Sequence, residues 1–525
     1  MTNPSVGAPR HAAPPPPRAG RREWTALVVL MLPLLLVSMD VSVLYFAVPA
    51  ISADLAPSGT QQLWIFDIYA FVLAGLLMTM GSVGDRIGRR KLLLIGAVAF
   101  GAASLGAAYA SSAEMLIAAR ALLGIGGATL MPSTMALVRS LFQDPAQRAK
   151  AIGVWSAVMT GGVALGSVMS GVLVEYFWWG SVFLVNLPAM ALLLVLAPLL
   201  IPESKDPAPG RFDLLSVPLS MAAVLPLVYG LKEIPSEGFA TPSVLSLLAG
   251  LVFTALFVLR QRTSASPLIP PALLSGSGFG PAVCLNSLAM FAMMGSAYFT
   301  TQYLQSVLGK SAMEAALWSL LPSVLIGLAA PVTTGLVQRG AHRGYVVTGG
   351  FVTAAGGFAL LTAAGTESLW LVLAGSGVLA CGVVTVMAQM TDVALAAAPP
   401  ERAGSASSLL ETGQEFGGAL GMAVLGSIGT AVFRHRMEDD APPGLPEAAT
   451  ETLGGALAVA TELPAGTGAA LTALARGAFT DGMGAAALGG TAVLLLAAVL
   501  ALVLVRRPTA GAPAERPAPN TLDHV

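Results

Sequence analysis

The stretch GSVGDRIGRRK, residues 81–91, places five charged side chains within seven positions of an otherwise apolar region. It lies between the apolar runs WIFDIYAFVLAGLLMTM and LLLIGAVAFGAASLGAAYA. A helix needs roughly 20 mostly apolar residues to cross a bilayer, and both runs approach that length. The stretch is therefore predicted to be a short loop at one membrane surface, joining two membrane-spanning helices.

The composition of the whole chain also indicates a membrane protein. Hydrophobic residues make up 55% of its 525 residues and charged residues 10%, and the mean hydropathy is +0.77. Soluble domains carry roughly 25% charged residues, so this chain has too little charge to cover a soluble surface. Because the net charge is −1, we expect no nucleic acid partner. The two cysteines, Cys284 and Cys381, are too few for a disulfide framework or a metal site, and we expect no cofactor.

Hydropathy along the chain predicts fourteen membrane-spanning helices. They cover residues 25–48, 62–83, 91–110, 114–138, 149–174, 180–201, 212–231, 242–260, 278–305, 313–337, 344–364, 368–395, 403–432 and 485–505. Lys and Arg favour the cytoplasmic side of a membrane, and here they are concentrated in both terminal segments and in alternate loops. This asymmetry agrees with an even number of spans. It predicts a multi-pass protein of the cell's inner (cytoplasmic) membrane, with both termini in the cytoplasm.

The order of the spans predicts two six-helix bundles. Residues 335–344 weakly repeat the charged loop, and glycine-rich segments at 161–171 and 413–421 occupy corresponding places in the two halves. Parallel halves around a central binding site are a design of secondary transporters. The predicted units are a disordered cytoplasmic tail (1–24), an N-terminal bundle (25–201), a two-helix insertion with its loops (202–277), a C-terminal bundle (278–505) and a cytoplasmic tail (506–525). Within the C-terminal bundle, residues 433–484 are expected to form an outer helical hairpin.

Ionisable residues within the predicted spans are candidates for chemistry. A charge at the centre of a span costs about 2.5–3.5 kcal/mol on insertion scales, so such residues need a reason to be there. The candidates are Asp40, Asp67, Arg120, Asp392, Glu411 and Glu415. A buried arginine needs a carboxylate or carbonyl partner, and Arg120 could bias proton release from a nearby acid.

Glu411 and Glu415 are four residues apart and therefore share one helix face. Two ionised acids so close together in a low dielectric are unfavourable, so one of them is expected to hold a proton near neutral pH. That property suits proton exchange. The alternative is that these acids pair with Arg120, or face a wet cavity, for structural reasons only.

Neighbouring residues indicate how an organic cation could bind. Trp64 precedes Asp67 by three residues, so its ring and the carboxylate can share a helix face and hold a lipophilic cation. An anchor at the membrane interface is an equally good interpretation of Trp64. Met290, Met293 and Met294 could line an adaptable pocket, although packing against lipid is the favoured interpretation.

Several stretches resemble the major facilitator superfamily. The loop 81–91 and the residues that follow it are similar to the superfamily's signature between spans 2 and 3, and the matching residues are Gly81, Asp85, Arg86, Gly88, Arg89 and Arg90. MDVSVLYFAVPAI (39–51) resembles the span 1 signature of its fourteen-span drug:proton antiporters, with Asp40 at the acidic position. WIFDIYAFVLAG (64–75) resembles span 2 of the quaternary-ammonium exporters, and RALLGIGGATLMPS (120–133) resembles the span 4 signature, with Arg120 as its arginine.

The resemblance implies a pump in the lipid bilayer that works by alternating access and is driven by proton entry, and we expect it to be a monomer. It implies lipophilic cations such as ethidium and quaternary ammonium biocides as substrates. Asp40 and Arg120 would couple the proton, and Asp67 and Glu411 would meet the cation or the proton, with Glu415 in support. Within the loop signature, Asp85 and Arg89 would form an inner latch that holds the halves together when the pump faces outward.

The fifth span departs from the family's antiporter signature. Gly162, Gly166 and Gly171 are its candidate close-packing positions, but the signature ends Gly-Pro-x-x-Gly-Gly and this chain has Ser167 for the proline and Ser170 for a glycine. The kink and the close packing of that helix are expected to differ.

Other classes of function fit the sequence less well. The segment VLGKS (307–311) has Leu304 where a phosphate-binding loop needs its first glycine, which argues against an ATP-driven pump. Four histidines in the tails and loops do not supply a metal-enzyme site, and we do not expect an enzyme. The open alternatives are a dedicated exporter of one natural product or antibiotic with the same fold, and a proton symporter for uptake.

Overall fold

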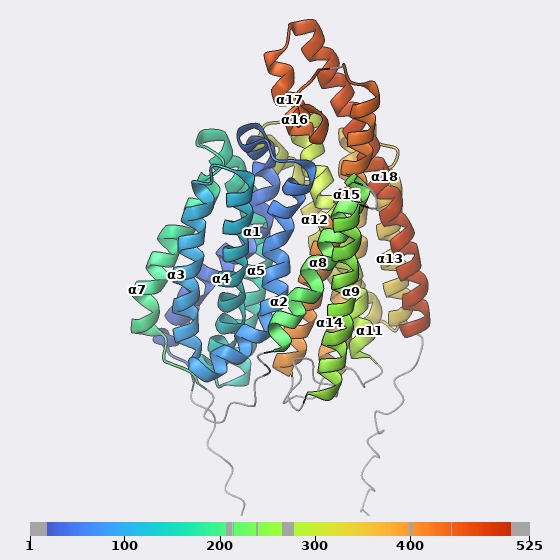
Figure 1. Cartoon of the computed structure of the whole chain (residues 1–525). Coiled ribbons are helices and arrows are strands. Elements are labelled where there is room, and N and C mark those ends of the chain that lie inside the picture. Colours follow the sequence, from blue (N-terminus) through green and yellow to red (C-terminus); the bar gives the residue numbers. More distant parts are fainter. Residues whose placement is uncertain are drawn as a thin grey trace, which may run out of the picture.

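The computed structural model describes residues 18–205, 213, 215–237, 240–264, 278–397, 403–442 and 444–505. Regular structure within these ranges is helical (Figure 1). The helices are α1 Arg21–Leu55, α2 Gly59–Ile87, α3 Arg89–Ala108, α4 Ala113–Leu141, α5 Pro145–Tyr176, α6 Ser181–Leu184, α7 Asn186–Leu200, α8 Ser216–Glu237, α9 Thr241–Thr263, α11 Phe279–Gln302, η1 Tyr303–Val307, α12 Ala312–Gln338, α13 Arg343–Leu361, α14 Leu369–Ala397, α15 Ala403–Asp440, α16 Glu447–Glu451, α17 Leu453–Glu462 and α18 Ala465–Val505. The predicted tail 506–525 and residues 1–17 of the predicted tail 1–24 lie outside the described residues.

The prediction of an all-α membrane protein is confirmed. Among the described residues, 12 helical segments are long and apolar enough to cross a membrane, and α6 with α7 forms one of them. Helix α8 adds a shorter apolar stretch, Ser216–Gly230, and α12 is 27 residues long. With these two included, the helices fit the predicted count of fourteen.

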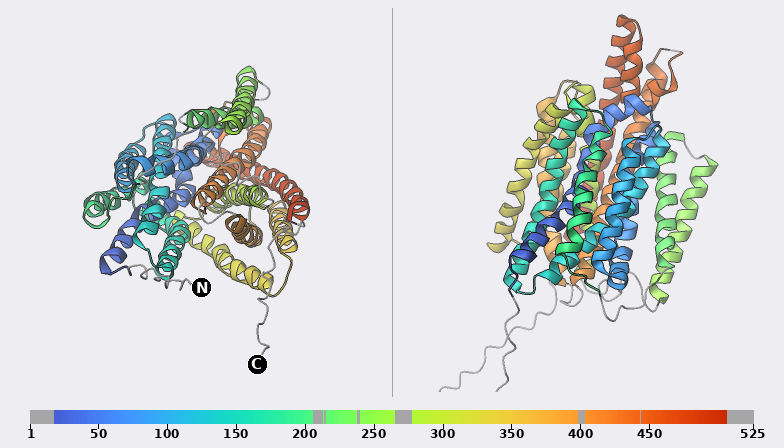
Figure 2. Two further views of the ribbon diagram at one scale, coloured as in Figure 1. Left: turned by 90° about the horizontal axis from the view of Figure 1, so that it is seen from below. Right: turned by 90° about the vertical axis from the view of Figure 1, so that its left-hand side faces the viewer.

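The long helices form two groups with a pair of helices beside them (Figures 1 and 2). In the first group α2 and α3 pack on α4, and α1 packs on α5; in the second group α11 packs on α14 and α15, and α13 packs on α14 and α18. We call α1–α7 the first half and α11–α18 the second half. The halves meet chiefly where α2 contacts α15 and where α5 contacts α12.

Both the start of α1 and the end of α18 lie at one end of the molecule, which we call the terminal end (Figure 1). The short helices α16 and α17 lie at the opposite end, which we call the hairpin end. Because an even number of crossings returns a chain to the side on which it began, this placement agrees with an even number of spans.

The hairpin differs from the sequence prediction in where its helices begin and end. Helix α15 continues past the predicted end of its span at 432 to Asp440, and the 41-residue α18 begins at Ala465, well before the predicted start of the last span at 485. Ion pairs four residues apart, Arg434 with Glu438 and Arg436 with Asp440, explain why the polar end of α15 stays helical. The alanine-rich start of α18 has high helix propensity and therefore continues into the last span without a break.

Candidate functional site

A buried ion pair joins three helices of the first half. The Arg120 guanidinium on α4 pairs with the Asp40 carboxylate on α1, and both side chains are 3% exposed. Arg120 Nε donates to the Ile65 carbonyl oxygen of α2 at 3.1 Å, and its guanidinium carbon lies 4.6 Å from the centre of the Tyr69 ring. A buried charge is stable only when it is paired and hydrogen-bonded, and here a carboxylate, a carbonyl and an aromatic face supply that environment.

A small cavity lies next to this ion pair, between the two halves. Helices α1, α2 and α4 line it from the first half, and α11 and α15 line it from the second half. Its charged residues are Arg120, Asp67, which is 2% exposed, and Glu415. The structure therefore brings Asp67 and Glu415, predicted from distant segments of the sequence, to one cavity beside Arg120.

Methionine side chains form much of the apolar wall of the cavity. Met290 and Met294 of α11 and Met422 of α15 line it. The favoured sequence interpretation, packing against lipid, is therefore wrong for Met290 and Met294. Hydropathy alone does not say which face of a span points inward, and the unbranched, polarisable methionine suits an adaptable wall.

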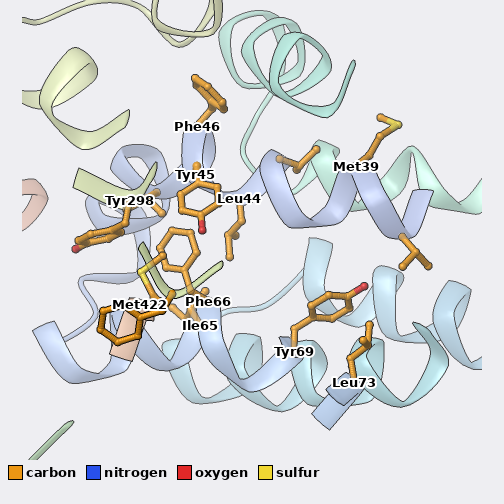
Figure 3. Close-up of a cluster of buried hydrophobic side chains, with 14 of the residues drawn as sticks. Met39, Leu44, Tyr45, Phe46, Ile65, Phe66, Tyr69, Leu73, Tyr298 and Met422 are labelled. Carbon is orange, nitrogen blue, oxygen red and sulfur yellow. The ribbon is translucent and has the colours of Figure 1, made fainter. Parts of the chain in front are cut away.

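Three aromatic rings, those of Tyr45, Phe66 and Tyr298, lie next to one another and come from both halves (Figure 3). The Tyr45 and Phe66 ring centroids are 5.0 Å apart, and those of Phe66 and Tyr298 are 5.5 Å apart in an edge-to-face arrangement. Gln62 Nε2 donates to Tyr298 Oη at 2.9 Å, and Tyr45 Oη donates to Met294 Sδ at 3.5 Å. Because each of these hydrogen bonds joins the two halves, the aromatic layer holds the halves together at this level.

Sequence reasoning did not single out Tyr45, Phe66 or Tyr298. The available signal was that a buried tyrosine needs a partner for its hydroxyl group, which makes a tyrosine within a span a candidate for a polar contact. Phe66 carries no such signal. Its place depends on the approach of α2 to α11.

Other sequence candidates lie away from the cavity lining. Glu411 is one helical turn from Glu415 toward the terminal end of α15. Trp64 packs against a separate apolar cluster that includes Phe71 and Val228. Asp392 on α14 is exposed.

The family model described as Major Facilitator Superfamily matches residues 30–422. The chain belongs to this superfamily. It is 42% identical over 494 residues to the multidrug efflux pump LfrA of Mycolicibacterium smegmatis, covering 93% of this chain and 98% of that protein. It is 34% identical over 486 residues to the methyl viologen resistance protein SmvA of Salmonella typhimurium, covering 91% and 97% respectively.

Among solved structures, the fold is similar to that of a bacterial homologue of the human lysosomal transporter Spinster in an inward-facing conformation. The TM-score is 0.65 at 18% identity, and the match covers 93% of this chain and 98% of the other. The predicted resemblance to the major facilitator superfamily is confirmed. The chain is a multi-pass transporter of this superfamily, with a multidrug efflux pump among its relatives, and it is not an enzyme.

The superfamily's loop signature divides into two groups of contacts at the terminal end. Arg89 pairs with Asp85, four residues before it. Arg90 instead donates to the Ile201 carbonyl oxygen at 2.9 Å, and its backbone N–H donates to Glu203 Oε1 at 2.9 Å. Arg90 thus fastens the start of α3 to the end of α7, whereas the Asp85–Arg89 pair joins the last turn of α2 to the start of α3.

Gly88 is the loop position that only glycine fits. Its φ of 110° is a conformation that residues with a side chain rarely adopt. A Cβ there would also lie 2.6 Å from the carboxylate carbon of Glu203. Gly81 is less constrained, because a Cβ would lie 3.9 Å from Pro132 Cβ.

The glycines of the fifth span contact both halves. A Cβ at Gly162 or Gly166 would overlap α1, and a Cβ at Gly171 would lie 3.0 Å from Met313 Cα in α12. The two serines that depart from the superfamily's antiporter signature have different environments. Buried Ser170 donates to the Val43 carbonyl oxygen of α1 at 2.7 Å, whereas Ser167 donates to its own helix at Val163, and α5 runs unbroken through both positions.

Proposed function

We propose that this chain exports lipophilic organic cations in exchange for protons, by alternating access of the central cavity. The observation that carries the proposal is the charge balance of that cavity. Two acids, Asp67 and Glu415, line it, while its described cationic residue, Arg120, is already matched by Asp40. An excess of acid in a water-poor site favours a positively charged cargo, because Coulomb attraction is strong at low dielectric.

The uncharged part of the lining fits the same class of cargo. Tyr45, Phe66 and Tyr69 present aromatic rings, and methionines fill the opposite wall. Aromatic faces attract cations, and such attraction is worth about 2 kcal/mol or more in a desolvated site. The name of the relative SmvA refers to methyl viologen, an organic dication.

Proton coupling follows from competition for the same carboxylates. A proton on Glu415 or Asp67 removes the negative charge that a cation needs, so proton and cargo bind in alternation. Glu411, one turn away on α15, is placed to pass a proton to or from Glu415. Protonation of Asp40 would leave the Arg120 charge unbalanced beside the cavity and would expel a cation.

The Asp85–Arg89 pair is proposed as the inner latch of the cycle. The pair lies at the terminal end, where it joins the last turn of α2 to the start of α3. In this proposal the terminal end faces the cytoplasm, and the protein acts as a monomer in the inner membrane. The concentration of Lys and Arg in the loops supports that orientation.

Ethidium movement in proteoliposomes under an imposed pH gradient tests the proposal. Asp67→Asn and Glu415→Gln are expected to abolish proton-driven movement, because each removes an acid from the cavity. Asp392→Asn is the matched control, since Asp392 is exposed on α14, and it should behave as the unmodified protein does. Folded protein that moves no ethidium under any gradient would contradict the proposal and favour a dedicated exporter of another compound.

A further inference from the structure

The two helices that separate the halves in the chain, α8 and α9, lie beside the line where the halves meet. Helix α8 contacts α2 of the first half and α15 of the second half, and α9 packs on α8 (Figure 1). Seen from the terminal end, the pair lies outside the other helices (Figure 2). We call the line between α2 and α15 the α2–α15 seam.

The wall of the cavity is thin at this seam. Ala70 of α2 and Ala419 of α15 line the cavity and also belong to the apolar cluster formed with α8. Side chains of one methyl group leave little bulk between the cavity and the outside of the two halves. Val224 and Val228 of α8 pack on the outer side of this cluster, and Val228 is 0% exposed.

Larger side chains extend the same cluster along the seam. Phe71 of α2 and Phe416 of α15 meet across it with ring centroids 6.2 Å apart. Trp64 packs on the cluster as well, which gives this residue a position on the seam. Helix α8 therefore covers the junction at the level of the cavity.

Helix α8 is held firmly in this position. A Cβ at Gly75 of α2 would overlap the Met221 side chain of α8, so the two helices are in close contact. At the terminal end of the pair, Asp213 accepts hydrogen bonds from Arg260 Nε at 3.0 Å and Nη2 at 2.9 Å. Gln261 Nε2 donates to Ser216 Oγ at 2.9 Å, so α8 and α9 behave as one unit.

We propose that the α8–α9 pair is a seal that separates the central cavity from the bilayer along the α2–α15 seam. Lipid tails are then kept out of the cavity, and a lipophilic cargo does not slip sideways between the halves during the cycle. This inference rests on the proposed function only in taking the cavity as the path of the cargo, whatever the cargo is.

Quenching of Trp64 fluorescence by brominated lipid tests the seal directly. In a protein that keeps Trp64 as its single tryptophan, we expect weak quenching by lipid brominated along its acyl chains. A protein that keeps only Trp370, which is 66% exposed, is the matched control and should be quenched strongly. Equal quenching of the two proteins would overturn the proposal.

Substitutions of increasing size at Gly75 are expected to separate α8 from α2 by increasing amounts. Gly75→Ala needs only a shift of the flexible Met221 tip, whereas Gly75→Phe must push α8 away from α2, so Trp64 quenching should rise along the series Ala, Leu, Phe. Retention of accumulated cargo in proteoliposomes should fall in the same order. Unchanged retention despite raised quenching would overturn the proposal.

If Gly75→Phe fails to fold, the double variant Val224→Ala/Val228→Ala gives the same readouts. The quenching needs no cargo, so its result is independent of whether the cargo is a cation.

Discussion

Two ion pairs of the same chemistry lie in opposite surroundings in this molecule. The side chains of Asp40 and Arg120 are both 3% exposed, whereas those of Asp85 and Arg89 are 42% and 14% exposed. Removing one partner of a buried pair leaves an unmatched charge in a low dielectric, while water solvates the partners of an exposed pair. The difference predicts that breaking the buried pair costs much more stability than breaking the partly exposed pair of Asp85 and Arg89.

The largest expected effect is on the buried pair. Asp40→Asn should destabilise the protein by about 3–5 kcal/mol, because it leaves Arg120 buried and unmatched. Unfolding by heat or denaturant in detergent measures this change. The double variant Asp40→Asn/Arg120→Gln removes both charges and should regain much of the loss. If the double variant is as unstable as the sum of its single changes, the pair is not the cause.

Asp213 forms a third pair that lies between these extremes, and it is sensitive to pH. Hydrogen bonds from Arg260 hold the pKa of the Asp213 carboxyl well below its usual range. An aspartate in an unfolded chain has a pKa of about 3.9. The stabilisation that the ionised Asp213 gives to the folded protein is therefore fully present above that pH and is lost as the pH falls further.

Asp213→Asn should therefore lower the melting temperature at neutral pH, by less than Asp40→Asn does. The difference in melting temperature between the variant and the unmodified protein should become smaller below about pH 4. At that pH the Asp213 carboxyl of the unmodified protein begins to take up a proton in the unfolded chain. Melting curves at neutral and acid pH measure both effects. If the difference in melting temperature does not change with pH, the ionised Asp213 carboxylate is not the cause of the stabilisation.

A smaller effect on stability is expected in α5, at the serines where this helix departs from the family signature. Ser170→Gly removes a hydrogen bond to the Val43 carbonyl of α1 and should cost about 1 kcal/mol of stability. Ser167→Ala is the control, because the Ser167 hydroxyl donates within its own helix and does not bond α1. Equal losses in the two variants would show that the contact between α1 and α5 is unimportant.

The smallest effect on stability is expected for the partly exposed Asp85–Arg89 pair, with a separate effect on transport. Asp85→Asn should change the free energy of unfolding by about 0–1 kcal/mol, as surface pairs do, yet slow ethidium export if the pair is a latch. Glu438→Gln is the matched control, because it breaks an exposed i,i+4 pair with Arg434 at the hairpin end. Transport unchanged by Asp85→Asn would contradict the latch, and the comparison between the two pairs would then rest on stability alone.

Sequence reasoning found the residues whose presence in a span needs a special cause. A charge in lipid is costly, so Asp40, Asp67, Arg120 and Glu415 could be identified without knowing their neighbours. The surroundings of apolar residues were harder to predict from the sequence. Met290, Met294 and Trp64 are favourable both in lipid and in a protein interior, so hydropathy does not distinguish a cavity wall, a seam and a lipid-facing surface.

The sequence by itself determined the class of this protein, its many spans and the identity of its intramembrane charges, because bilayer thickness and the cost of buried charge act on local residues. Only the tertiary structure decided which charges meet. Arg120 lies beside Asp40, 80 positions away, while Glu415 comes to the same cavity from the other half of the chain. The placement of α8 over the α2–α15 seam likewise depends on how side chains fit between three helices, such as Met221 against Gly75, which no local pattern encodes.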